Sequence, residues 1–428
     1  MRKLLLAVLL VPALASATGY SITNYVPRDM AMGDSLVADQ TSAGAVYRNP
    51  AALARLSGLN LTLAGALIAN GSTWTTTTGL SPSPVSTDLK LVPAPAIFVS
   101  WSGKIADHGY GVGVGVTAPG GGRVDWPNGW PGRYAIQTVD RKFFGTFLMA
   151  GAEIIPQIRI GGGLIYYFTT EKLTTYIPVP APGGTTDALA TIGDSGGQFS
   201  FDLALEVQPV MSFPLRIGVN YSHQAYQKLT GTLNLAAPPP LAPVFPNQAT
   251  THVLPYPSVL AVGVSWRVIP DLVLTLQYTW EGYSIYTSDT FVGETTNPST
   301  GQVLTVSVQR QYRNSSLYRI GAGYQLLPIL ELRAGLYYDA SGVNPAYYNP
   351  SLPDANKVVG SVGAGWEVMK NLSIEAAFLY AWFLKLDSVP AASTTTIDNA
   401  SSFPGQFQSW GWIASVGVNW KWDPQTKN

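Results

Sequence analysis

Residues 410–422 read WGWIASVGVNWKW, and every second position of this stretch carries an apolar side chain. Successive side chains of a β-strand point to opposite faces, so Trp410, Trp412, Trp420 and Trp422 share one face. At ~3.3 Å per residue and a tilt of ~40°, the inner pair of tryptophans is about 20 Å apart and the outer pair about 30 Å. These separations bracket the apolar band of roughly 25 Å between the aromatic girdles of membrane barrels. The stretch therefore predicts a strand that crosses a membrane.

The same alternation recurs along the chain before this strand. Residues 372–382 place Ile374, Phe378 and Trp382 on one face and Glu375 with smaller residues on the other. Short connections are predicted at 103–108, 155–157, 208–213, 269–271, 327–329 and 369–371, and long ones near 70–94, 119–136, 171–196, 229–256, 288–315, 341–357 and 387–407. These six short and seven long connections join fourteen strands. We therefore predict an all-β fold, a transmembrane antiparallel barrel of about 14 strands with short periplasmic turns and long outer loops.

The composition fits such a barrel and argues against several other classes of protein. Charged residues make up 12% of the chain and aromatic residues 11%, against a usual charged share of about 25% in soluble proteins. Lysine and arginine together number 25, as do aspartate and glutamate, which argues against a nucleic-acid partner. Cysteine is absent from the sequence, so neither disulfides nor thiolate chemistry contribute.

The N-terminal region divides into a leader and a segment that does not read as a strand. Residues 1–17 combine a short basic start, an apolar run and the small residues Ala15-Ser16-Ala17, which predicts a secretory signal peptide. Residues 32–56, MGDSLVADQTSAGAVYRNPAALARL, are rich in small residues and contain Asn49, Pro50 and Ala51. We expect residues 18–57 to fill the barrel as an N-terminal hatch, residues 58–423 to form the wall, and residues 424–428 to form a tail.

Several motifs in order resemble the FadL/TodX family of outer-membrane proteins. They are Asn49-Pro50-Ala51 with the preceding Met32-Gly33, then Trp130-Pro-Gly-Arg-Tyr134, Tyr318-Arg-Ile-Gly-Ala-Gly-Tyr324, Leu332-Arg-Ala-Gly-Leu-Tyr-Tyr-Asp339, Leu352-Pro-Asp354, Gly363-Ala-Gly-Trp366 and Asn371-Leu-Ser-Ile374. The resemblance implies an outer-membrane barrel that admits long-chain fatty acids and other hydrophobic compounds. It also implies a kink in the third strand that opens the wall sideways, where this chain has Gly111, Gly113 and Gly115.

The inward faces of the predicted strands carry two kinds of residue. Near the short-turn end they carry a collar of both signs that could pair with the hatch, namely Glu153, Arg159, Glu206, Arg216, Arg267, Glu331, Arg333 and Glu367. Further up they carry the apolar candidates for a substrate pocket, namely Phe143, Phe147, Met149, Ile165, Tyr167 and Leu379. An apolar lumen suits a hydrophobic ligand, because burying apolar surface stabilises by ~25 cal/mol/Å². Packing of the same side chains against the hatch is the open alternative.

Catalysis finds no support in the sequence. His108, His223 and His252 are predicted in a turn, at a strand end and in a loop, without the spacing of a metal site or a catalytic triad. We predict no enzyme activity, no cofactor and no metal. The predicted outer loops 176–182 and 233–245 are apolar and could capture a ligand. Prolines that only stiffen these long loops are the open alternative, which is favoured for 176–182.

These observations predict a monomeric channel of the cell outer membrane for passive uptake of hydrophobic molecules. Its partners would be fatty acids, hydrocarbons or detergent-like amphiphiles, together with outer-membrane lipid. The expected route is binding in the lumen, rearrangement of the hatch and lateral release. A porin for polar solutes and a non-transporting surface or adhesion barrel remain alternatives.

Overall fold

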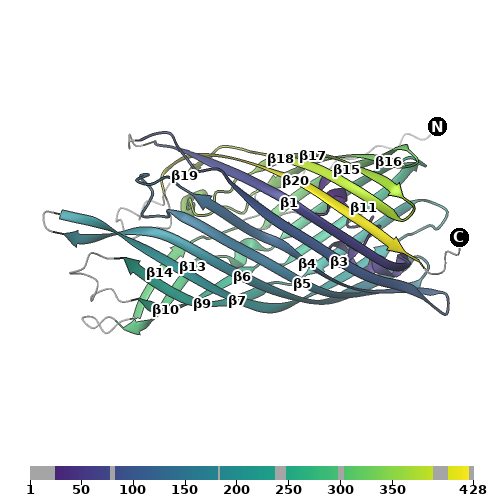
Figure 1. Ribbon diagram of the computed structural model, residues 1–428, viewed down its shortest axis with the longest axis horizontal. Coiled ribbons are helices and arrows are strands. Elements are labelled where there is room, and N and C mark those ends of the chain that lie inside the picture. The colour runs from purple at the N-terminus through teal and green to yellow at the C-terminus, as the bar shows by residue number, and fades with distance from the viewer. Residues whose placement is uncertain are drawn as a thin grey trace, which may run out of the picture.

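The computed structural model describes residues 25–77, 82–181, 184–236, 247–296, 303–388 and 403–423, so the predicted signal peptide and C-terminal tail lie outside the described residues. The chain forms a long cylinder of tilted strands, and the helices of the N-terminal segment lie inside one end (Figure 1). The helices are α1 (Pro27–Ala31), α2 (Ala45–Arg48), η1 (Pro50–Arg55), η3 (Tyr283–Ile285) and η4 (Pro345–Tyr347). None of the helices among the described residues has the length and apolar character needed to cross a membrane.

The strands follow one another around the cylinder in chain order. They are β1 (Gly58–Thr75), β2 (Val85–Ser86), β3 (Lys90–Ile105), β4 (His108–Asp125), β5 (Thr138–Ile155), β6 (Ile158–Ala181), β7 (Gly184–Val207), β8 (Leu215–Ser222), β9 (Ala225–Ala236), β10 (Gln248–Tyr256), β11 (Val259–Ile269), β12 (Leu272–Glu281), β13 (Ser288–Thr296), β14 (Val303–Gln309), β15 (Ser315–Leu327), β16 (Leu330–Ala340), β17 (Lys357–Met369), β18 (Leu372–Phe383), β19 (Leu386–Ser388) and β20 (Gly405–Trp422). Every pair of neighbours is antiparallel, and β20 pairs with β1 from Leu59↔Trp422 to Thr75↔Gln406. This last pairing closes the sheet into a barrel.

The predicted number of strands is confirmed. In five places two consecutive strands continue one another across a short break, namely β8/β9, β10/β11, β12/β13, β14/β15 and β18/β19, and β2 adds only two residues beside β1. The wall therefore contains fourteen antiparallel strands. All six of the short turns predicted from the sequence join neighbouring strands, and β1 begins at Gly58.

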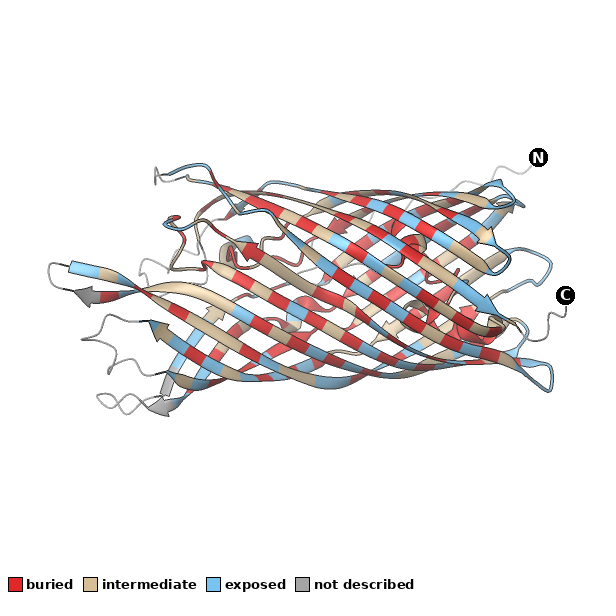
Figure 2. Ribbon diagram, in the orientation of Figure 1, coloured by how far each residue is buried: buried red, intermediate tan, exposed pale blue. Residues whose placement is uncertain are grey.

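Side chains along each strand alternate between an exposed outer face and a buried inner face (Figure 2). On β18, Phe378 and Trp382 are exposed, whereas Glu375 and Leu379 are only 3% exposed. The outer face at this level is apolar and the inner face is mixed, which is the reverse of a soluble barrel. The pattern of the sequence and the pattern of burial therefore agree on which face meets lipid.

Three of the predicted long loops are wrong, because strands run through them, and one of the three, 288–315, contains β13 and β14. The region 171–196 belongs to β6 and β7, which stay paired out to Ala181↔Gly184, and the region 229–256 contains parts of β9 and β10. The outward side chains here are polar, for example Lys228, Thr230 and Thr232 on β9. The outward face of these segments is therefore polar, so no apolar outer stripe marks them as membrane-crossing strands in the sequence.

An upper extension, formed by β9, β10, β13 and β14, rises from the long-loop end of the barrel. It is separated from the strands below by breaks at 223–224, 257–258, 282–287 and 310–314. Pro257 lies in the second break, where it cannot donate to a ladder. The extension stays joined to the wall through β7, which pairs with β9 from Leu189↔Ala236 to Ser195↔Thr230.

Candidate functional site

Residues 25–57, here called the plug, lie inside the short-turn end of the barrel (Figure 1). Most of their side chains are buried, including Met30, Leu36 and Leu53 at 0% exposure. Helix α1 packs against β17 and β18, and η1 packs against β5 and β6. The closed wall of the barrel thus encloses the N-terminal segment of the same chain.

The predicted hatch residues Asn49, Pro50 and Ala51 form the join between α2 and η1. Asn49 Oδ1 accepts a hydrogen bond from the Ala51 N–H at 3.1 Å, which caps η1. Asn49 Nδ2 donates to Val37 O at 2.7 Å and to Leu205 O of the wall at 3.2 Å. Pro50 takes the first helical position, where its missing N–H costs nothing. One buried amide therefore ties the plug to itself and to β7.

Glycines on the inner face of the wall make room for this turn. A Cβ on Gly151 would lie 2.3 Å from Pro50 O, and a Cβ on Gly161 would lie 2.3 Å from Ala51 N. Any side chain at either position would collide with the plug backbone. The backbone of η1 therefore seats directly on the backbones of β5 and β6.

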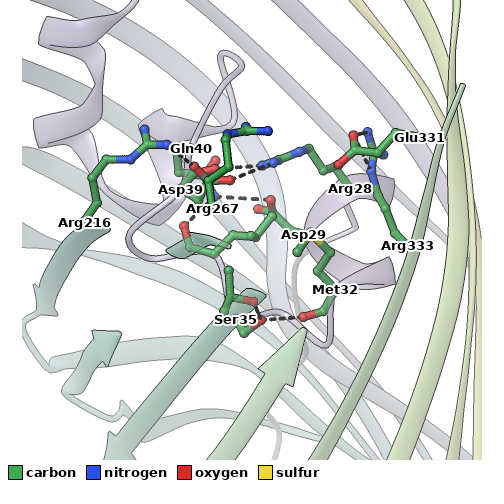
Figure 3. Close-up of polar contacts among 12 residues, drawn as sticks. Arg28, Asp29, Met32, Ser35, Asp39, Gln40, Arg216, Arg267, Glu331 and Arg333 are labelled. Atoms are coloured by element: carbon green, nitrogen blue, oxygen red, sulfur yellow. Dashed lines mark hydrogen bonds and ion pairs between the residues drawn. The ribbon is translucent and has the colours of Figure 1, made fainter. Parts of the chain in front are cut away.

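Ion pairs fix the plug to the wall in addition to this packing. Asp39 binds Arg216 of β8, with Oδ1 and Nη2 2.7 Å apart, and it binds Arg28 of the plug at 2.8 Å (Figure 3). Arg55 pairs with Glu206 of β7 at 3.1 Å. Asp34 pairs with Arg319 of β15 at 2.7 Å, a wall residue that sequence analysis missed. These three contacts hold the plug at separate points around the barrel.

The other predicted collar residues lie near the plug without all contacting it. Arg159 bridges Glu153 and Glu206, and Glu331 pairs with Arg333 beside Arg28. Arg267 donates to Pro270 O, and Glu367 is exposed. The collar is thus only partly used for the plug.

The surroundings of Asp39 keep its carboxylate charged. Burial alone would raise the pKa of Asp39, but the charges of Arg28 and Arg216 and the hydrogen bond from Arg28 hold it below its ordinary value of 3.8. Asp39 belongs to the plug, which does not span the membrane. The ion pair with Arg216 is therefore fully formed at neutral pH.

A cavity of about 490 Å³ lies above the plug. Plug residues Tyr25 and Tyr47 form part of its floor, and Phe143, Leu317 and Leu379 form part of its apolar wall. Ligand-binding cavities of proteins usually measure about 300–1,000 Å³ and have mostly apolar walls. The size and lining of this cavity suit a small or medium hydrophobic molecule.

The six predicted pocket residues divide into two groups. Phe143 and Leu379 line the cavity. Phe147, Met149, Ile165 and Tyr167 are buried but do not line it. Phe147 lies with its ring 5.2 Å from that of Tyr47 in the plug, and Tyr167 packs against Phe147 on the far side. The structure therefore places Phe143 and Leu379 at the cavity and Phe147 against the plug.

Aromatic side chains and an inward-folded loop lie at the long-loop side of the barrel. Trp126 and Trp130 stack with ring centroids 4.1 Å apart, and Trp74 meets Trp130 edge-on. Residues 351–354 of the connection after β16 line the cavity, and Trp126 Nε1 donates to Pro350 O at 3.2 Å. This side of the lumen is therefore packed with indole rings whose N–H groups have acceptors.

The cavity reaches the outer face of the wall between β3 and β4. Pairing of these strands runs from Ile105↔His108 to Ala96↔Thr117 and stops there, although both strands continue. Pro93 and Pro95 lie on β3 beyond this point, where they lack the N–H that a ladder needs. Leu91, Pro93 and Pro95 line the cavity although they are exposed on the outside.

The facing segment of β4 contains a register shift between Thr117 and Gly120 in its pairing with β5. Ala118 to Gly122 line the same cavity. We call the space between Leu91–Pro95 and Ala118–Gly122 the lateral gap. The signal for it in the sequence is the pair of alternate prolines on β3, which sequence analysis did not use.

The predicted opening at Gly111, Gly113 and Gly115 lies below this gap. All three residues are paired with β3 on one side and with β5 on the other. A Cβ on Gly111 would lie 2.5 Å from Leu53 O, and a Cβ on Gly113 would lie 2.4 Å from Val46 Cγ2, both in the plug. The ladder is thus unbroken at these glycines, and their nearest neighbours include the plug.

The apolar loop segments and the histidines complete the predicted features. Tyr176 lies on β6 and Leu233 on β9, whereas the remainder of the two segments lies partly outside the described residues. His108 starts β4 and His223 lies in the break between β8 and β9. His252 lies on β10, not in a loop, and is 1% exposed.

Comparisons with known proteins agree with this architecture. Residues 8–422 match the model of a family described as outer membrane protein transport protein (OMPP1/FadL/TodX). An outer-membrane protein of Neisseria meningitidis serogroup B is 22% identical, with 98% of this chain and 97% of that protein covered. The crystal structure of a Pseudomonas aeruginosa FadL homologue superposes with a TM-score of 0.80 at 19% identity, covering 94% of this chain and 100% of that chain. The Ralstonia pickettii toluene transporter TbuX superposes with a TM-score of 0.68 at 16% identity, covering 93% and 98%.

Proposed function

Because the chain belongs to the OMPP1/FadL/TodX family of outer-membrane transport proteins, we propose that it admits hydrophobic molecules through the outer membrane without an energy source. The observation that carries this proposal is the cavity of about 490 Å³, which has an apolar wall, a floor formed by the plug and a lateral gap. A water-filled pore for polar solutes has no need of Phe143 and Leu379 on its inner wall. A hydrophobic ligand gains from them, because burial of apolar surface stabilises by ~25 cal/mol/Å².

The proposed route has three steps. A ligand is captured at the outer side of the barrel and enters the cavity. A shift of the plug, whose Tyr25 and Tyr47 line the floor, then changes the shape of the cavity. The ligand leaves sideways through the lateral gap into lipid. Sideways release avoids returning the ligand to water, which would cost ~0.8 kcal/mol per exposed CH₂ group.

The charges around the cavity favour an uncharged ligand. Each basic side chain that lines it forms an ion pair with an acid, in the pairs Arg48–Asp34, Arg123–Asp125, Arg141–Glu171, Lys142–Asp140, Arg319–Asp34 and Lys357–Asp339. A ligand carboxylate would have to displace one of these acids or lie buried without a partner, and both are costly. Hydrocarbons carry no such cost. TbuX, a toluene transporter, has the same fold.

The experiment that tests the function compares two ligands in cells that lack other routes of uptake. Cells that produce the protein should take up a neutral alkylbenzene faster than cells that do not, and a long-chain fatty acid should compete poorly. Planar-bilayer recordings should show low conductance, because the plug fills the lumen. A large and steadily open pore, with no effect on hydrocarbon uptake, would favour a polar-solute porin instead.

A further inference from the structure

A cluster of buried charges in the upper part of the barrel reaches the cavity only through Arg141. Glu171 of β6 and Asp194 of β7 lie directly opposite one another in the antiparallel ladder, at 3% and 6% exposure. Like charges in this position destabilise a sheet. Two buried carboxylates side by side therefore need a positive charge between or beside them.

Gly231 allows the Asp194 side chain to reach across its neighbour. The register places Asp194 opposite Gly231 of β9, and a Cβ on Gly231 would lie 2.6 Å from the Cβ of Asp194. With no side chain there, Asp194 faces His252 on β10, and His252 Nδ1 lies 3.7 Å from Asp194 Oδ2. Ligand atoms of Glu171, Asp194 and His252 all lie within 4.8 Å of one another.

The atoms that face the centre of this triad have no hydrogen-bond partner among the described residues. They are Glu171 Oε1, both carboxylate oxygens of Asp194 and His252 Nδ1. The distance of 3.7 Å from Nδ1 to Asp194 is too long for a hydrogen bond. A single proton on Nδ1 could serve only one of the two carboxylates. A metal ion would serve all three side chains at once.

The other side of the imidazole is held as in many metal sites. His252 Nε2 lies 3.3 Å from Asp289 Oδ1. Asp289 is itself fixed by Arg310, with Nη2 and Oδ2 2.7 Å apart, and by the Tyr286 hydroxyl at 2.7 Å. A histidine ligand usually donates its second ring N–H to a carboxylate in this way, which leaves the first nitrogen free for the metal.

The charge count also leaves room for a cation. Arg141 and Arg310 supply two positive charges, against three negative charges on Glu171, Asp194 and Asp289. Arg141 contacts Glu171 through Oε2 and so leaves Oε1 for a ligand. The third positive charge of the described cluster comes either from a second proton on His252, which lies between Asp194 and Asp289, or from a metal ion that replaces this proton.

From this geometry we propose that Glu171, Asp194 and His252 bind a divalent transition-metal ion of the zinc class, which fastens β6 and β7 to β10. One imidazole nitrogen with two carboxylates suits Zn²⁺ better than Ca²⁺ or Mg²⁺, which prefer oxygen alone. Ligand atoms of a tetrahedral zinc site lie about 3.3 Å apart. The distances between the ligand atoms would therefore shorten by up to about 1.5 Å when the ion binds.

The experiment measures zinc bound to the purified, folded full-length protein. The protein is treated with a chelator, desalted, incubated with Zn²⁺ and analysed for metal by mass spectrometry, with affinity taken from calorimetric titration. We expect about one zinc ion per chain in the wild type and its loss in His252→Gln and in Asp194→Asn. Asp289→Asn should bind about tenfold more weakly, because it affects the ligand only through its hydrogen bond.

His223→Gln is the matched control, because it removes a histidine from the break between β8 and β9 and should leave zinc binding unchanged. Folding of each variant is checked by the shift in gel mobility between heated and unheated samples. The proposal is overturned if the folded wild type takes up no more zinc than the folded His252→Gln and Asp194→Asn variants. That result would mean that a proton or a water molecule, and not a metal ion, lies between the three side chains.

Discussion

Asp39 of the plug and Arg216 of β8 are joined by an ion pair with 2.7 Å between Oδ1 and Nη2, and Arg28 contacts the second oxygen of the same carboxylate at 2.8 Å. Removing one partner of a buried pair leaves the other charge uncompensated, which typically costs about 3–5 kcal/mol. Asp39→Asn should therefore loosen the plug. We expect increased leakage of small polar dyes through the barrel, with normal assembly of the wall. Asp107→Asn, in an exposed turn, is the control, and equal leakage from both variants would contradict a role of Asp39 in holding the plug.

The same ion pair predicts how the plug responds to acid. The pKa of Asp39 is lowered from 3.8, so the stabilisation that this carboxylate provides is fully present above that value. It is lost as the pH falls through the lowered pKa. Leakage through the wild type should be constant between about pH 7 and pH 4 and rise only below that range. In Asp39→Asn the leakage should already be high at neutral pH. If leakage through this variant still rises at acid pH by as much as in the wild type, the rise is caused by the protonation of another group.

Substitutions at two glycines of β4 distinguish a glycine that leaves room for the plug from a glycine that lies beside the lateral gap. A Cβ on Gly113 would lie 2.4 Å from Val46 of the plug, whereas a Cβ on Gly122 would meet no atom within 4 Å. Gly113→Val should displace the plug and raise dye leakage. Gly122→Val should narrow the lateral gap, so that uptake of an alkylbenzene falls much more than its binding in the cavity, while leakage stays unchanged. If Gly113→Val instead lowers uptake with no leakage, the exit lies lower in the wall than the gap.

Much of the wall could be predicted from the sequence, because lipid imposes a period of two on every strand that faces it. The alternation in residues 410–422 reappears as exposed Val416, Trp420 and Trp422 against buried Ile413 and Ser415. The short turns could be located for the same reason, since each one lies between two strands that show this period. The upper extension escaped prediction because polar residues cover its outer face, so that its strands look like loops.

The candidate site was harder to predict from the sequence, because it depends on strand register and on contacts between residues far apart in the chain. Arg319 meets Asp34 across 285 residues of chain, and no spacing in the sequence relates them. Likewise His252 approaches Asp194 only through the register of three strands. The alternate glycines of β4 did not identify the opening, because glycine occurs both where a strand kinks and where another backbone approaches closely. Pro93 and Pro95 carried the better signal for an unpaired edge.

The division of the predicted pocket residues into two groups gives the last prediction. Phe143 lines the cavity, whereas Phe147 does not line it and meets Tyr47 of the plug at 5.2 Å. Phe143→Ala should weaken binding of a neutral hydrophobic probe about tenfold, because the ligand loses apolar contact worth ~25 cal/mol/Å² over one ring face. Phe147→Ala should leave a void between wall and plug, with a cost of about 3 kcal/mol and increased dye leakage.

Probe fluorescence in purified protein and dye leakage from vesicles measure the two effects separately. Leu148→Ala is the matched control, because its side chain is 61% exposed on the outer face and touches neither the cavity nor the plug. Equal loss of probe binding in Phe143→Ala and Phe147→Ala, without leakage in either, would mean that the ligand lies deeper, against the plug. In that case Phe147 and Tyr167 would belong to the binding site, and the plug would have to move before the ligand binds.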